Sequence, residues 1–187
     1  MNFLVINGHK YYPYAQGRLN KTLFDEIIRI LKNNGDEVVT TVVEDGYNFE
    51  EEIEKYKNAD FIIFQTPMNW FSVPWILKKY FDDVYAHGVF YTGSKEYGRG
   101  GLLGGKKYMF SITCNTVETA FDNPNTFFDG KSHEDLIIAL HKTQQFCAMV
   151  PVKSFFCFDV VHNPDIEKYM KNLNNHMQIY VLNNYIS

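Results

Sequence analysis

Residues 16–22 carry side chains that could bind an anion at the start of a predicted helix. The N–H groups of a first helical turn lie at the positive end of the helix dipole and therefore favour a phosphate. Arg18 adds positive charge. A plain helix start with a surface arginine is an equally weighted alternative, since the sequence has neither a Walker loop nor a G-x-G-x-x-G motif. The candidates are Gln16, Gly17, Arg18, Leu19, Asn20 and Thr22, with His9 as a loop histidine that either meets the phosphate or is merely solvated.

A second segment brings aromatic side chains into a predicted loop. Tryptophan and phenylalanine can wall a flat heterocycle while the loop backbone meets the edge of that ring. The alternative is that the two tryptophans fill the core. We favour that alternative for Trp75, which falls inside a predicted helix, and a binding role for the loop residues Pro67, Met68, Asn69, Trp70 and Phe71.

A third segment, Thr113, Cys114, Asn115 and Thr116, offers hydroxyl and amide groups to the polar edge of a ring. Ordinary turn chemistry is the alternative, because Asn and Thr favour turns in any case. Cys114 is either a reactive thiol or, as is more common at the end of a strand, a small apolar residue.

Strands and helices alternate along the chain, which predicts one α/β domain over residues 1–187 with a parallel sheet covered on both faces. For five strands the favoured doubly wound order is 2-1-3-4-5. The strands are expected at residues 3–7, 37–43, 61–65, 107–113 and 152–158. The helices are expected at residues 19–30, 47–57, 74–81, 132–147 and 164–181, with Ser72 capping the third and Ser132 and Asp135 forming a capping box for the fourth.

These elements must position the three segments together. Sheets of this kind bind ligands beyond the carboxyl ends of their strands, near the point where the strand order reverses. The loops at residues 8–18, 66–71 and 114–130 all follow strands next to that point. We therefore expect them to converge on one binding site.

Composition excludes several other classes of protein. The 18 basic and 22 acidic residues give a net charge of −4, which argues against a nucleic-acid partner. No apolar run has membrane-spanning length, so we expect a protein that is not embedded in a membrane. The three cysteines are widely spaced and form neither a disulfide framework nor a zinc set, which favours the reducing cytoplasm. Residues 133–135 (His-Glu-Asp) indicate a helix start, and we predict no metal site.

The same residues carry a family resemblance. The sequence resembles the flavodoxin-like NAD(P)H:quinone reductases, and within them the bacterial "modulator of drug activity B" group. The matching pieces keep their order and spacing over nearly the whole chain. They are residues 5–8, 17–20, 67–70, 74–75, 78–80, 82–84, 97–98, 100–101, 104–109 and 120–121, with Thr113 and Asn115.

The resemblance implies a homodimeric enzyme that binds FAD, with FMN less favoured, and reduces quinones with NADH or NADPH. It implies that residues 15–22 hold the phosphate and ribose region of FAD, that residues 67–70 border the isoalloxazine ring, and that residues 113–116 face its polar edge. Tyr97 would contact the quinone as the catalytic residue, although a loop anchor is nearly as good an interpretation. Phe121, with Phe127 and Phe128, would wall the pocket across a dimer interface, and a buried loop cluster without a binding role is the alternative.

Three other functions are compatible with this fold. An FMN-dependent azo- or nitroreductase is the nearest alternative, and a flavin-binding regulatory subunit of a membrane transporter is a non-catalytic one. A one-electron flavodoxin carrier is less favoured, because such carriers are usually strongly acidic and a net charge of −4 is mild.

Overall fold

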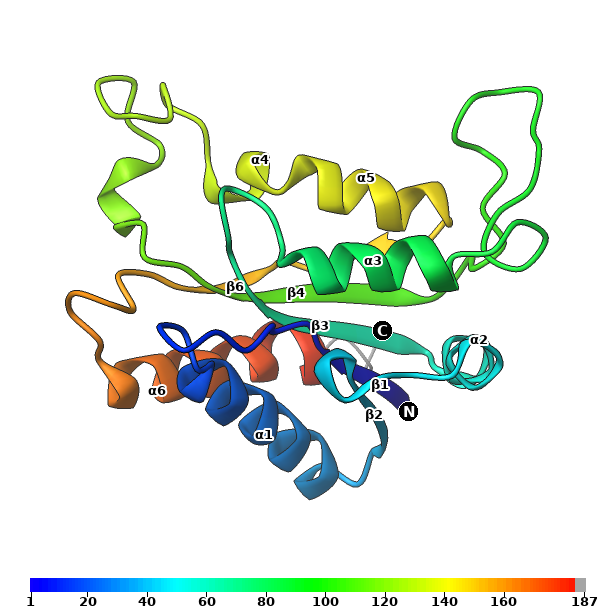
Figure 1. The fold of residues 1–187 in the computed structure, drawn as a ribbon, viewed down its shortest axis with the longest axis horizontal. Helices are drawn as coiled ribbons and strands as arrows, with labels where there is room; N and C mark the ends of the chain where they lie inside the picture. The colour runs from blue at the N-terminus through cyan, green and yellow to red at the C-terminus, as the bar shows by residue number, and fades with distance from the viewer. Residues whose placement is uncertain (184–187) are drawn as a thin grey trace.

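A computed structural model describes residues 1–183 as a parallel sheet with helices on both faces (Figure 1). The sheet order is β2-β1-β3-β4-β5, and β6 also pairs with β4, so the predicted doubly wound order is confirmed. The strands are β1 (Asn2–Asn7), β2 (Glu37–Val42), β3 (Phe61–Pro67), β4 (Lys107–Thr113), β5 (Val150–Pro151) and β6 (Phe155–Cys157). None of the helices within residues 1–183 has both the length and the apolar character needed to cross a bilayer.

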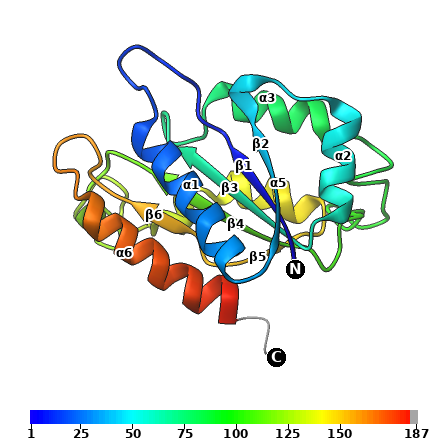
Figure 2. The ribbon, with the colours of Figure 1, turned by 90° about the horizontal axis from the view of Figure 1, so that it is seen from below.

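The helices divide between the two faces of the sheet. Figures 1 and 2 show α1 and α6 side by side on one face, with α3 and α5 on the other. Each face has its own apolar core, to which α1 and α6 contribute on one side and α2, α3 and α5 on the other. The helices are α1 (Arg18–Asn33), α2 (Phe49–Asn58), α3 (Trp75–Val84), α4 (His133–Leu136), α5 (Ile138–Phe146) and α6 (Ile166–His176), which continues as a π-helical turn (Met177–Leu182); two 3-10 turns lie at Val43–Asp45 and Glu118–Ala120.

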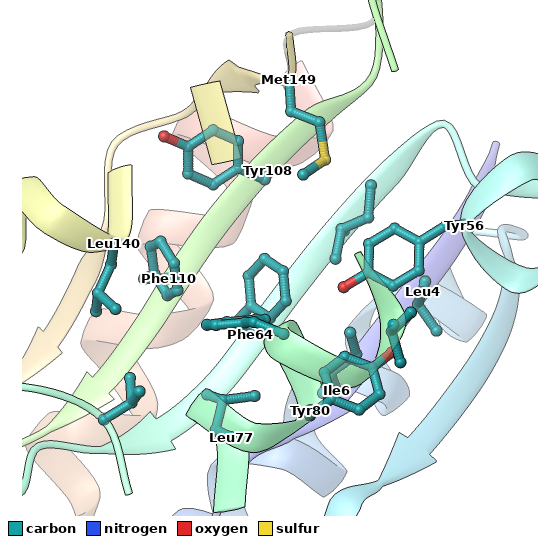
Figure 3. Close-up of a cluster of buried hydrophobic side chains, with 14 of the residues drawn as sticks. Leu4, Ile6, Tyr56, Phe64, Leu77, Tyr80, Tyr108, Phe110, Leu140 and Met149 are labelled. Atoms are coloured by element: carbon teal, nitrogen blue, oxygen red, sulfur yellow. The ribbon is translucent and has the colours of Figure 1, made fainter. Parts of the chain in front are cut away.

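Alternation along the strands supplies both cores. In β1, Leu4 and Ile6 face the α2/α3/α5 core, while Phe3 and Val5 face the α1/α6 core. Figure 3 shows Leu4 and Ile6 in the first of these cores, together with side chains such as Phe64, Leu77 and Tyr80. Successive side chains of a strand point to opposite faces, so a strand buried on both faces is apolar along most of its length.

The strand predicted at residues 152–158 is shorter than expected, and a separate short strand, β5, precedes that range. β5 pairs with the start of β4 and β6 with its end, and the backbone leaves the ladder in between. There the N–H of Ser154 donates to the Glu134 carboxylate at 2.9 Å instead of to a strand. The structure therefore keeps only residues 155–157 of the strand predicted at residues 152–158, and at Ser154 a side chain from α4 takes a backbone N–H that a continuous ladder would use.

Two further expectations about helices are corrected. Pro74 occupies the cap position of α3, while Ser72 exchanges backbone hydrogen bonds with Asn69, so Ser72 does not cap this helix. Trp75 is 57% exposed and is not a core residue. The buried side chains of α3 begin with Leu77, and a residue two positions earlier on a helix points to the opposite side. The capping box of Ser132 and Asp135 is present, as predicted.

A polar network attaches α4 and α5 to the edge of the sheet. Glu134 accepts hydrogen bonds from the Ser154 N–H and hydroxyl, and its carboxylate lies 2.8 Å from Nε2 of His141. The other ring nitrogen of His141 lies 2.8 Å from the Tyr108 hydroxyl. Burial raises the pKa of Glu134, but the hydrogen bonds from His141 and Ser154 outweigh burial and hold this pKa below its ordinary value.

We expect Glu134→Ala to lower the free energy of unfolding by about 2 kcal/mol near neutral pH, because it removes a charged acceptor from buried donors. The folded pKa of Glu134 is depressed, so its contribution is present above the unfolded pKa and is lost as pH falls through the folded pKa. The difference between the two proteins should therefore narrow below about pH 4. Denaturant unfolding at several pH values measures this. Glu118→Ala, an exposed matched control, should change stability little; an equal loss in both variants would contradict the role of Glu134.

Candidate functional site

Three loops leave the sheet at the carboxyl ends of its strands, which form one edge of the sheet, called the carboxyl edge below. β1, β3 and β4 are adjacent and parallel, with Asn7 opposite Gln65 and Pro67 opposite Thr113. The loops that follow Asn7, Pro67 and Thr113 therefore start side by side. A hydrogen bond of 2.8 Å from the Met68 N–H to the Thr113 carbonyl connects two of them directly.

Buried amides hold this edge together. Ser111 donates to Gln65 at 2.6 Å, Gln65 donates to Asn20 at 2.9 Å, and Asn20 donates to Asn7 at 2.8 Å. The Asn7 oxygen also accepts the His9 N–H at 3.1 Å. Asn20 is 2% exposed and both of its amide atoms contact protein, so the structure places this candidate beneath the loops, where it positions the start of α1.

The start of α1 has no side-chain cap. Gly17 occupies the cap position with φ 72°, and the N–H groups of Arg18, Leu19 and Asn20 have no acceptor within residues 1–183. A β-carbon on Gly17 would lie 2.4 Å from the His9 ring, so only glycine fits there. Such a set of N–H groups at a helix start is suited to an anion.

The side chains around this helix start add positive charge. Arg18 donates to the neutral Gln16 amide at 2.9 and 3.2 Å, and the first turn of α1 contains no acidic residue. Thr22 donates to the Arg18 carbonyl, while Leu19 packs against the α1/α6 core. Burial lowers the pKa of His9, whose Nε2 lies 3.1 Å from the Ala15 carbonyl. Arg18 is therefore the charged side chain that this predicted set offers to a ligand.

The second loop is a strained turn with exposed rings. Asn69 and Ser72 pair through their backbones, and the two central residues, Trp70 and Phe71, have φ values of 50° and 63°. This is a type I′ turn, which favours Asn and Gly and is costly for bulky residues. Trp70 is 93% and Phe71 48% exposed, and their N–H groups lack acceptors in the described chain. Strain of this kind clusters at functional sites.

The third loop is held by residues that follow β6. The Asn115 side-chain oxygen accepts the Val161 N–H at 3.1 Å, and the Thr116 carbonyl accepts the Asp159 N–H at 3.1 Å. The Asn115 amide nitrogen has no partner within residues 1–183. Thr113 is buried at the end of β4. Asn115 and Thr116 therefore present the accessible polar groups of this segment.

Cys114 is a core residue. It is 3% exposed, and burial raises the pKa of its thiol to about 12. A thiol that stays protonated at neutral pH is a poor nucleophile. Of the two interpretations of Cys114, the small apolar residue is the one that the structure supports.

Aromatic residues join the second and third loops. The ring of Phe71 stacks against Phe127 with centroids 5.9 Å apart, and Phe121 stacks against Phe128 at 4.4 Å. Phe127 is 75% exposed, whereas Phe121 is 5% exposed. The structure thus places Phe121 in the interior of this cluster and Phe127 on its surface, beside the same edge as Trp70.

Tyr97 lies at the other edge of the sheet. α3 runs back across the sheet, and residues 86–105 then lead into the amino end of β4; Figure 1 shows this segment at the opposite side of the molecule from residues 114–130. Tyr97 is 94% exposed, and its ring lies 5.9 Å from that of Phe146. Beside them is a cavity of about 900 Å³. Within one chain, Tyr97 is therefore remote from the other predicted site residues.

The buried partners of Asn20 are the residues that our sequence reasoning missed. Asn7, Gln65 and Ser111 are polar residues within or at the end of otherwise apolar strands, and this is the signal that could have identified them. A buried polar side chain needs a partner, so several of them at one edge of a sheet indicate a network.

Comparison with known proteins agrees with this architecture. A family described as having a flavodoxin-like fold matches residues 1–179. The NADPH:quinone oxidoreductase MdaB of Haemophilus influenzae is 37% identical over 188 residues, covering 95% of this chain and 98% of that protein. This chain belongs to the flavodoxin-like NAD(P)H:quinone reductase family.

Solved structures share the fold of this reductase-family chain. A Klebsiella pneumoniae protein assigned as a quinone reductase matches with a TM-score of 0.80 and 22% identity, covering 95% of this chain and 84% of that one. An FMN-dependent NADH-azoreductase of Bacillus anthracis, in complex with FMN, matches with a TM-score of 0.67 and 16% identity over 95% of each chain. At these identities the likeness concerns the fold alone.

We expect Trp70→Asn to raise the free energy of unfolding by roughly 0.5–1 kcal/mol, because asparagine adopts positive φ more readily and little packing is lost at a 93% exposed side chain. Denaturant unfolding measures the change. The matched control is Trp75→Asn, which lies in α3 and should give no gain. Destabilisation by Trp70→Asn would show that the Trp70 ring makes a net contribution to the fold that outweighs its backbone strain.

Proposed function

We propose that this chain is an FAD-dependent NAD(P)H:quinone oxidoreductase that acts as a homodimer. The observation that carries the proposal is the convergence at one edge of an uncapped helix start, two unpaired turn N–H groups and exposed aromatic rings. Together these features fit the phosphate, the polar edge and the flat face of a flavin.

Different residues would contact different parts of the cofactor. The N–H groups of residues 18–20 and the Arg18 side chain would hold the phosphate region, and residues 67–71 would border the ring system. Asn115 and Thr116 would meet its polar edge. Bound flavin would supply the chemistry, by accepting a hydride from NADH or NADPH and passing it to the quinone.

The protein's own contribution is orientation and electrostatics. The N–H groups of Trp70 and Phe71 donate no hydrogen bond within the described chain, so they are available to stabilise negative charge on a bound ring. Those of Met68 and Asn69 are occupied by the Thr113 and Ser72 carbonyls. In the second loop, the N–H groups that could take this role are therefore those of Trp70 and Phe71.

Homodimerisation would bring Tyr97 to this site. One end of the chain exposes Trp70 and Phe127, and the other has a cavity bordered by Tyr91, Tyr97 and Phe146. A two-fold axis that sets two chains antiparallel would place the exposed rings of each against the cavity of the other. The Tyr97 hydroxyl of one chain could then donate a hydrogen bond to the quinone oxygen in the site of the second chain.

We further propose that the protein works in the cytoplasm and that its flavin is FAD. The three cysteines of the described chain are free and buried, which suits the reducing cytoplasm. An FMN-dependent azoreductase is the second candidate, supported by the shared fold of the FMN-bound Bacillus anthracis enzyme. Identification of the flavin released from purified protein separates the two.

We expect the purified protein to carry a yellow chromophore, or to take up added FAD, and to oxidise NADH or NADPH continuously when a quinone such as menadione is supplied. Arg18→Glu should weaken FAD affinity by about tenfold or more, because a charge-assisted contact to phosphate is replaced by repulsion. Flavin absorbance and anaerobic titration with each nicotinamide measure both properties.

Lys32→Glu is the matched control for this experiment. It makes the same change of charge at the opposite end of α1 and should leave FAD affinity near the wild-type value. A colourless protein that takes up neither FAD nor FMN would refute the proposed function. Equal losses in the two variants would place the phosphate elsewhere.

Mixing of two defective variants tests the shared site. Hybrids of Arg18→Glu and Tyr97→Ala chains contain one site in which both groups are wild type, provided that Tyr97 acts across the dimer. We expect quinone reduction at limiting FAD to rise above the average of the two parents. No rise in a preparation shown to contain hybrids, or full activity of Tyr97→Ala alone, would contradict the proposed role of Tyr97.

A further inference from the structure

Two stacked tyrosines project beside the start of α1. The rings of Tyr12 and Tyr14 are 5.3 Å apart with an interplanar angle of 13°, and Tyr14 is 85% exposed while Tyr12 is half-buried. Figure 2 shows the segment between β1 and α1, which contains them, extending beyond the sheet. An exposed ring backed by a second ring is a ready stacking surface for another flat group.

The backbone holds this pair in place. The N–H and carbonyl of Tyr12 pair with those of Ala15 at 3.2 and 2.9 Å, which closes a tight turn around Pro13. The Ala15 carbonyl also lies 3.1 Å from the His9 ring. Lys10 forms an ion pair with Glu44 and so fastens the beginning of the same loop. The Tyr14 ring is therefore presented from a braced turn rather than from a free chain.

The pair lies close to the proposed phosphate position. Tyr14 precedes Arg18 by four residues, so their α-carbons are at most about 14 Å apart. No acidic residue occurs in residues 8–24, so the stretch of chain that joins them carries no negative side chain of its own. A flat group joined to a diphosphate at the start of α1 by one ribose could reach the open face of Tyr14.

We propose that Tyr14, supported by Tyr12, stacks on the adenine ring of FAD and thereby makes the site prefer FAD to FMN. This inference rests on the proposed function. The two tyrosine rings are already in contact, so adenine lies on the outer face of Tyr14 and not between them. FMN has no adenine and gains nothing from this contact.

The test is equilibrium binding of FAD and of FMN to the full chain stripped of bound flavin, followed by flavin fluorescence. Tyr14→Ala should weaken FAD binding on the order of tenfold, the lower part of the range for stacking of a base on an aromatic side chain. FMN binding should not change. Tyr14→Phe keeps the stacking surface and should bind FAD as the wild type does.

Tyr11→Ala is the matched control, because Tyr11 is half exposed in the same loop but outside the stacked pair. It should leave the affinity for both flavins unchanged. Equal losses of FAD and FMN affinity in Tyr14→Ala, or no loss of either, would overturn the inference while flavin binding by the wild type still supports the proposed function. A wild-type protein that binds neither flavin would overturn both.

Discussion

The buried run of hydrogen bonds from Ser111 through Gln65 and Asn20 to Asn7 is the constraint on which the site depends. An unpaired polar group in such a position costs about 1–3 kcal/mol, so the amides can be buried only together. Pairing of these four side chains couples the register of β1, β3 and β4 to the position of α1. A slip of one residue would turn every strand side chain to the opposite face. The same contacts therefore stabilise the fold and place the start of α1 at the carboxyl end of the sheet, where the candidate site lies.

The loops at the carboxyl edge differ from the hydrogen-bonded sheet, because they contain strained backbone and groups without protein partners. Five of the six non-glycine residues with positive φ in the described chain, Trp70, Phe71, Asp122, Asp129 and Asp159, lie in loops at the carboxyl edge. Exposed aromatic rings and unpaired N–H groups occur there as well. The backbone strain lowers stability, while the exposed rings and the N–H groups without protein acceptors leave contacts for a ligand to make. Strained loops on an unstrained sheet are the distribution expected where function opposes folding.

Local patterns predicted most of the architecture. Apolar strands and amphipathic helices such as α1 can be predicted from sequence because the burial of their residues repeats with the period of the element. The capping box at Ser132 could also be predicted, since both of its partners lie within four residues. One of the errors has a long-range cause. β5 and β6 separate because Glu134, twenty residues from Ser154, takes its N–H. The error at Ser72 is local: its backbone closes a turn with Asn69, and the cap position of α3 lies two residues later than expected, at Pro74.

The sequence by itself determined the strand order, the helices on both faces and the three loops that share one edge, because these follow from periodicity and from the connection rules of parallel sheets. Only the tertiary structure decided that Asn20 lies beneath the candidate site, that Cys114 is buried in the core, and that Tyr97 lies beside Phe146 at the opposite end of the sheet. The burial and direction of a side chain depend on neighbours that are distant in sequence, and the spacing of residues along the chain does not indicate which residues those neighbours are.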